Sequence, residues 1–443
     1  MTTLAPARSR ALAFRLLWAS VTVSALGDGI RFVAMPLLAS RVTGDPRLIA
    51  LVAVAGHVSW LLSPLAGLLA DRLPRRPVLV GVDAGRALLA GLLAWAVAAG
   101  QSSVGLLAVV TFLLGCGEVL YAAACAGAVP ALVGTDRLAA ANSRLQSSAI
   151  LSDTLLGPPL GAILLGAGAA VPLGADAVSF ALAAGLVACA TLPGRPPAPP
   201  LGGRVRAEAL AGLRLVAREG AIRRSLLGSA TFSLVTDGLA AMLVVWTGRV
   251  LGLGDLGYAL LVAAFAVGGL AGALAAPRLP VRGALRAAPW CAALASALAA
   301  TAHGALLAGA ALFTYGLGFG AWNVHAQTER QRRTPVELMG RAGVAGAAVC
   351  GLASATGAVL AGALTTAAGP RAAFAAGGVV LGGLAVWWGR GGYGGGPVRR
   401  SAPRPLASPR VDSNHPCRTG GWAREYVVVG AVLRGRLRGR RDR

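Results

Sequence analysis

The feature that most constrains this chain is a succession of apolar runs, each long enough to cross a bilayer as a helix. A spanning helix needs about 20 apolar residues, and its backbone polar groups are satisfied internally. Mean hydropathy is +0.68, and 13% of the 443 residues are charged, too few to cover a soluble surface. We predict an all-α polytopic membrane protein with twelve transmembrane helices in two six-helix bundles. The windows are residues 14–40, 48–70, 78–99, 104–130, 145–167, 171–192, 224–248, 256–276, 286–302, 304–327, 342–367 and 371–390.

The arginine distribution predicts the orientation. The formal net charge is +24, and there is no lysine. The arginines form short clusters between apolar runs, which is typical of cytoplasmic loops and not of a nucleic-acid-binding module. With a cytoplasmic N-terminus, 22 arginines precede the tail in inside segments and 4 lie in outside loops (Arg41, Arg47, Arg249 and Arg371). We therefore expect a cell (inner) membrane protein with both termini cytoplasmic and no nucleic-acid partner.

Composition divides the chain into four segments. Residues 1–192 and 224–390 hold six predicted helices each. Residues 193–223 begin Pro- and Gly-rich and end as a basic amphipathic stretch, so we expect a cytoplasmic linker with a short surface helix. Residues 391–443 are rich in Arg, Pro and Gly and hold no apolar span, which predicts a disordered cytoplasmic tail without a transport role.

The two predicted bundles share a weak internal similarity. Asp28-Gly29 in the first helix matches Asp237-Gly238 in the seventh. Gly157 in the fifth helix matches Gly357 in the eleventh. This pattern favours a parallel repeat about an axis along the membrane normal.

A polar loop between the second and third helices carries the most specific motif, Gly67-Leu-Leu-Ala-Asp71-Arg72-Leu-Pro-Arg75-Arg76. Read alone, it is a positive-inside loop. Its spacing resembles the signature loop of the major facilitator superfamily, with Pro74 where the family usually has Gly. The resemblance covers about residues 10–390 and implies conformational roles for Gly67, Asp71, Arg72, Arg75 and Arg76. We expect Gly67 to allow close helix approach.

The fifth helix contains Gly157-Pro158-Pro159-Leu160-Gly161-Ala162. It resembles the antiporter motif of drug exporters in the same superfamily, with Ala162 replacing the final Gly. A generic proline kink is the alternative. Residues 136–144 and 335–341 resemble loops of the branch that contains siderophore exporters and macrolide-efflux-like permeases. These resemblances imply export, with Gly157, Pro158 and Gly161 as the motif residues.

Charged side chains inside predicted spans are the candidates for proton coupling. They are Asp28, Glu118, Asp153 and Asp237. Burial favours the neutral form of a carboxyl group, as a proton-coupled carrier needs, but each could instead be a structural partner. Arg31 lies one turn from Asp28 and could neutralise it.

Three further charged or titratable side chains in the spans have other expected roles. We expect Asp83 and Arg86 to support the signature loop. We expect the isolated His57 to be an interface or packing residue and not a ligand.

The function that these features predict is proton-driven efflux of a small amphipathic organic compound by a monomer, with the lipid bilayer as solvent. The substrate cavity would lie between the bundles. Proton symport of a small metabolite and a non-transporting sensor remain alternatives. No nucleotide-binding loop, catalytic constellation or metal cluster is visible, so we predict no enzyme activity, cofactor or metal. Cavity candidates are the large or polar residues among Ala and Gly: Met35, Tyr121, Trp246, Phe265, Tyr315, Trp322 and Asn323.

Overall fold

The computed structural model describes residues 7–70, 72–133, 138–192, 219–334 and 339–390. All of them belong to one compact unit, Met1–Gly394. The predicted linker helix, apart from its last residues, and the predicted tail lie outside the described residues, as does Asp71.

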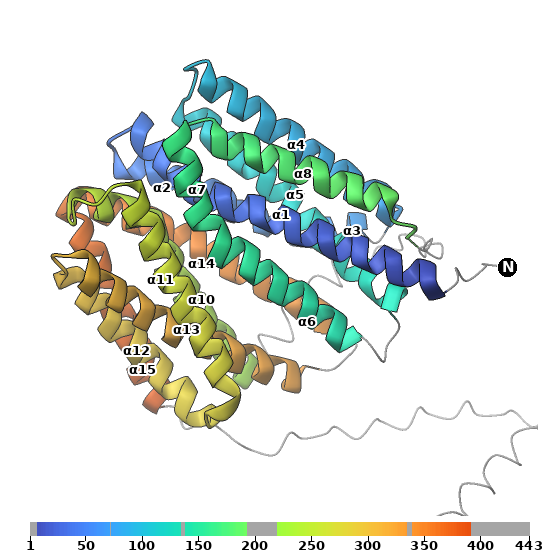
Figure 1. Cartoon of the computed structure of the whole chain (residues 1–443). Coiled ribbons are helices and arrows are strands. Elements are labelled where there is room, and N and C mark those ends of the chain that lie inside the picture. The colour runs from blue at the N-terminus through green and yellow to red at the C-terminus, as the bar shows by residue number, and fades with distance from the viewer. Residues whose placement is uncertain (1–6, 71, 134–137, 193–218, 335–338, 391–443) are drawn as a thin grey trace, which may run out of the picture. The chain divides into compact units, whose positions relative to one another are not determined.

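Twelve helices in the described part of the chain are long and apolar enough to cross a membrane, as predicted (Figure 1). The described residues contain no strand. The first half consists of α1 (Ala7–Val42), α2 (Pro46–Val58), η1 (Ser59–Leu62), α3 (Ser63–Ala70), α4 (Arg75–Ala98), α5 (Val104–Val133), α6 (Leu138–Ala149), η3 (Ile150–Leu156), α7 (Gly157–Ala167) and α8 (Val171–Cys189). The second half consists of α10 (Gly220–Arg249), α11 (Asp255–Ala275), η4 (Ala276–Arg278), α12 (Val281–Thr301), α13 (Ala305–Arg333), α14 (Met339–Ala368) and α15 (Pro370–Arg390).

Two of the spans are interrupted. In the second span the 3₁₀ segment η1 joins α2 to α3, and the Ser59 hydroxyl donates to the Gly56 carbonyl at 2.6 Å. In the fifth span η3 is a π-helical segment that ends just before Pro158. Proline has no N–H to donate to the carbonyl one turn back, so the regular ladder cannot continue there.

Glycines set the closest helix contacts at equivalent places in both halves. A Cβ atom on Gly157 of α7 would overlap the backbone of Gly29 in α1. In the second half, a Cβ on Gly238 of α10 would overlap the backbone of Gly357 in α14. The residues that suggested an internal repeat therefore meet each other in each half.

Large apolar side chains on the outside of the unit identify lipid as its solvent. Leu306 is 89% exposed and Val379 is 75% exposed. Aromatic side chains fill the inside of the second half. The Trp322 ring lies between Phe232 and Trp388, with centroids 5.0 and 4.8 Å away, and Trp246 packs on Phe374.

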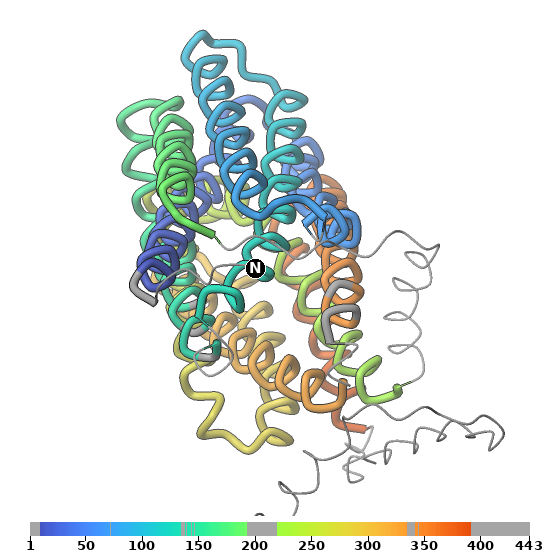
Figure 2. The backbone as a smooth tube through the Cα atoms, turned by 90° about the vertical axis from the view of Figure 1, so that its right-hand side faces the viewer, coloured from blue at the N-terminus to red at the C-terminus, as the bar shows by residue number. Residues whose placement is uncertain are grey.

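The most extensive contacts between the two halves are those of α2 with α14 and of α7 with α11, and α10 also contacts α1 and α2. Figure 2 shows the orange α14 running beside the blue α2. At the end where α1 and α10 finish, Arg41 pairs with Asp255, and Arg249 donates to the Gly44 carbonyl. Both contacts connect one half to the other at the same end of the unit.

Candidate functional site

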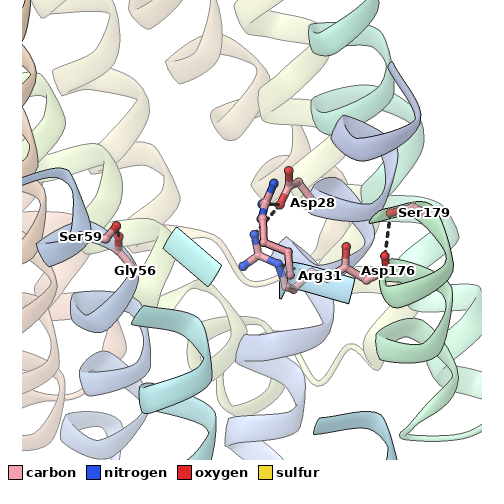
Figure 3. Close-up of polar contacts among 7 residues, drawn as sticks. Asp28, Arg31, Gly56, Ser59, Asp176 and Ser179 are labelled. Carbon is pink, nitrogen blue, oxygen red and sulfur yellow. Dashed lines mark hydrogen bonds and ion pairs between the residues drawn. The ribbon is translucent and has the colours of Figure 1, made fainter. Parts of the chain in front are cut away.

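Four charged side chains, Asp28, Arg31, Arg86 and Asp176, form a largely buried cluster inside the first half, and Figure 3 labels Asp28, Arg31 and Asp176. The Nη2 atoms of Arg31 and Arg86 each lie 2.6 Å from the same oxygen of Asp28, Oδ1. The Arg31 Nε also lies 3.3 Å from Asp176 of α8. The predicted pairing of Asp28 with Arg31 is confirmed, and two more helices contribute to it. Because low dielectric makes an unpaired charge costly, this cluster fixes α1, α4 and α8 relative to each other.

Arg86 is enclosed by an aromatic ring and by a glycine that leaves space for its side chain. Its guanidinium lies 3.9 Å from the ring centroid of Phe180, and a Cβ on Gly117 would crowd its alkyl chain. Arg86 donates to Asp28 in α1, whereas Asp71 of the signature loop, which it was expected to support, lies outside the described residues. Asp83, one turn earlier on α4, is fully buried beside it.

Glu118 is half-buried on α5, within electrostatic range of Asp28, Arg86, Arg31 and His57. It does not line the cavity described next.

A cavity of about 180 Å³ lies between the halves. Its walls come from α1, η3 and α7 on one side and from α10, α11, α13 and α15 on the other. Two predicted proton-coupling residues, Asp153 and Asp237, face it together with the predicted Phe265 and Tyr315. The remaining lining residues are Phe32, Thr154, Pro158, Thr236, Leu239, Ala240, Leu243, Val262, Leu312 and Phe374.

The cavity combines apolar walls with a few oriented polar groups, which is typical of a small-molecule site. The Tyr315 hydroxyl and the Thr236 hydroxyl lie 3.0 Å apart, and the Tyr315 ring packs against Phe265 with centroids 6.0 Å apart. These contacts hold the aromatic wall in place beside the Asp237 carboxyl group.

Asp237 also contacts α2 of the opposite half and α14 of its own half. The His57 Nε2 of α2 lies 3.8 Å from its Oδ2, and the Ser354 hydroxyl of α14 donates to the same oxygen. The other ring nitrogen, Nδ1, lies 2.7 Å from the Ala53 carbonyl. A carbonyl only accepts, so Nδ1 carries the proton in this contact.

With Nδ1 donating to the Ala53 carbonyl, Nε2 is the ring nitrogen that faces the Asp237 carboxyl group across the interface. No sequence pattern predicted this pairing, because the two residues lie in different halves.

The signature loop is described only in part. Arg76 donates to the Ala188 carbonyl in the last turn of α8, where a cation complements the helix dipole. The Arg75 side chain lies beside Gly127 of α5, and Arg72 is exposed. The explanation offered for Gly67 is wrong, because no described atom lies within 4 Å of the place its Cβ would take.

The antiporter-like motif lies against α1. Gly157 faces the backbone of Gly29, and Gly161 faces that of Ile30. Pro158 lines the cavity. The motif thus joins a close helix contact to the cavity wall.

Five of the predicted cavity residues lie elsewhere. Met35, Trp246 and Trp322 are buried in helix packing, because large apolar side chains gain more from the helix cores than from an open cavity. Tyr121 is also buried, with its hydroxyl 3.0 Å from that of Ser20. Asn323 is exposed and does not line the cavity.

Sequence reasoning missed several cavity residues. Phe32 lies one residue after Arg31, and Thr154 follows Asp153, so their proximity to candidate charges was a usable signal. His57 gave no such signal. Among the described residues, no group of three or more His, Cys, Asp or Glu side chains is placed to hold a metal ion.

Comparisons with known proteins agree with this architecture. A bacterial homologue of the human lysosomal transporter Spinster, in an inward-facing and occupied conformation, is similar at 13% identity and a TM-score of 0.71, with 86% of this chain and 96% of that chain covered. The human organic anion transporter MFSD10 (TETRAN) is similar at 17% identity and a TM-score of 0.60, with 87% and 100% covered. A search of curated protein sequences found no match.

These likenesses show the fold, and the sequence itself shows the family. The sequence profile of the Major Facilitator Superfamily matches residues 17–356, which include most of both halves and every cavity-lining residue except Phe374. Members of this superfamily are membrane transporters that bind small molecules within the bilayer. The chain belongs to the major facilitator superfamily.

Proposed function

We propose that this protein is a secondary active transporter that exports a small amphipathic organic compound in exchange for protons. The observation that carries the proposal is the cavity shared by the two halves. Its aromatic and aliphatic walls suit an apolar body, and its two carboxyl groups suit a polar or cationic end. The antiporter-like motif in α7 favours export over uptake. The exported compound would be a drug, a siderophore or a secondary metabolite.

We assign the proton to the His57–Asp237 pair, with Asp153 as the second carboxyl group in the cavity. Asp237 lines the cavity and contacts α2 of one half and α14 of the other. A change in its protonation state would therefore alter contacts in both halves. Asp28 is assigned a structural role, because two guanidinium groups hold one of its oxygens.

The proposal includes a topology. We place the protein as a monomer in the cell membrane with both termini in the cytoplasm, which the arginine asymmetry supports. The Arg41–Asp255 and Arg249–Gly44 contacts then lie at the outer end and close it. In an alternating-access cycle this corresponds to the inward-facing state.

A flux experiment tests the function. The purified chain would be reconstituted in lipid vesicles, with ethidium as the amphipathic probe and an imposed pH gradient. We expect ethidium to accumulate against its own gradient and in the direction opposite to proton flow. Asp237→Asn and His57→Gln should lose this accumulation but retain ethidium exchange without a gradient, because the cavity remains while the coupling proton is lost.

Glu219→Gln is the matched control, since Glu219 is an exposed carboxyl group outside the cavity. It should transport like the unmodified chain. Accumulation in the same direction as the protons would instead support symport. No flux of ethidium or of neutral and anionic amphipathic dyes would support the non-transporting alternative. Full proton-driven accumulation by Asp237→Asn would move the coupling assignment to Asp153.

A further inference from the structure

A second cavity, remote from the proposed transport site, lies on the surface of the protein where α10 begins and α15 ends. Its volume is about 660 Å³. Three arginines line it, namely Arg223 and Arg224 from α10 and Arg390 from α15. The other lining residues are Gly220, Leu227, Gly383, Val386 and Trp387, so no acidic side chain is among them. Glu219 is adjacent in sequence but outside the lining.

The arginines are arranged in two layers. Arg224 is half-buried, donates to the carbonyls of Trp387 and Trp388 at 3.0 and 2.9 Å, and lies 4.8 Å from the ring centroid of Trp387. Its interactions hold α10 against the end of α15. Arg223 and Arg390 are exposed, so their charges lie at the mouth of the groove.

The apolar part of the groove continues along the two helices, away from their charged ends. Leu227 is 49% exposed and Trp387 is 44% exposed. Neither Gly220 nor Gly383 has a described atom within 4 Å of the place a Cβ would take. Among the described residues, these two glycines therefore make no close helix contact along the groove.

We propose that this groove binds the headgroup of an anionic phospholipid. The spanning helix α10 begins here and the spanning helix α15 ends here. The groove therefore lies at the level of the headgroups, where tryptophan and arginine are favoured. Guanidinium groups bind phosphate oxygens in paired hydrogen bonds, and the open wall at Leu227 and Gly383 accommodates the start of an acyl chain. A free phosphate would use the arginines but gain nothing from that wall. In the proposed topology this is the cytoplasmic leaflet, whose surface is anionic.

Native mass spectrometry of the full chain in detergent tests the proposal, with phosphatidylglycerol as the probe and phosphatidylcholine as the neutral-headgroup comparison. We expect tighter binding of phosphatidylglycerol, and a loss of about tenfold or more in its affinity in Arg223→Gln/Arg390→Gln, since each arginine near a lipid surface contributes a severalfold factor. Arg282→Gln/Arg286→Gln removes the same charge from exposed α12 positions outside the groove and should change little.

Gly383→Leu supplies a test without any change of charge. It fills the groove where no described neighbour would be displaced, and it should weaken phosphatidylglycerol binding while leaving the protein monodisperse. Equal loss in the Arg282/Arg286 control would mean that attraction is only by net charge and would overturn the proposal. Unchanged affinity in both groove variants, or displacement of the lipid by millimolar inorganic phosphate, would also overturn it. None of these outcomes depends on transport, so this experiment tests the lipid site independently of the proposed export.

Discussion

At the residue scale, the buried charges of the first half act as a set of pairs. Arg31 has two acidic partners, Asp28 and Asp176, whereas Arg86 is held by Asp28. The i,i+3 spacing within α1 made the first pair predictable. Arg86 and Asp176 could not be foreseen as its partners, because sequence spacing carries no information about which faces of α4 and α8 turn toward α1.

The pairing predicts which second substitution rescues Asp28→Asn. Alone, this change leaves an uncompensated guanidinium in a buried site and should destabilise the protein by about 3–5 kcal/mol. Adding Arg86→Gln leaves the Arg31–Asp176 pair intact and should recover most of the loss. Adding Arg31→Gln leaves Arg86 and Asp176 without their contacts and should not. The temperature at which the monodisperse peak is lost in detergent measures the difference; equal rescue by both second changes would show that only the summed charge matters.

At the element scale, apolar windows predicted all twelve spans but not their ends or interiors. α1 begins at Ala7 instead of residue 14, and α13 continues to Arg333 instead of residue 327. A hydropathy window ends where the bilayer does, whereas helical hydrogen bonds continue into polar sequence. The predicted boundary between the windows 286–302 and 304–327 is where α12 ends, at Thr301, and α13 begins, at Ala305.

The glycine contact between α1 and α7 gives a prediction about helix packing. Gly157→Ala places a methyl group on the backbone of Gly29 and should destabilise the protein by about 1–3 kcal/mol through overpacking. Gly357→Ala should do the same between α14 and α10. Gly166→Ala, on the same helix as Gly157 but with open space around it, is the control and should be neutral. Thermal melts of the three variants check this, and a neutral Gly157→Ala would remove the packing explanation of the motif.

At the scale of the whole unit, contacts between the halves determine which conformations are populated. The twelve-helix architecture followed from composition, but the side chains that join the halves did not. Arg41 was predicted only as a charge of an outside loop, and its partner Asp255 lies 214 residues away in the sequence. Interfaces of this kind depend on how the two halves dock, and a single sequence does not encode that in any local pattern.

The Arg41–Asp255 contact predicts a shift in population. Arg41→Glu places like charges together and should open that end of the unit, changing the ratio of closed to open molecules by up to about fivefold, as an exposed pair contributes about 0.2–1 kcal/mol. Arg41→Glu/Asp255→Arg should restore the ratio. Paired spin labels at Leu48 and Leu256 measure the distance across this end. Arg47→Glu, an exposed arginine on the same side, controls for charge alone; a matching shift there would contradict the role of the pair.

The position of Asp237, at once in the cavity wall and beside a histidine of the other half, has a consequence in equilibrium thermodynamics. If a bound compound changes the affinity of this site for a proton, the proton must change the affinity for the compound by the same factor. Binding in detergent, with neither membrane nor gradient, would then release or take up a fraction of a proton. The heat of binding would accordingly vary with the ionisation enthalpy of the buffer, so calorimetry in two buffers would count the protons exchanged for each molecule bound.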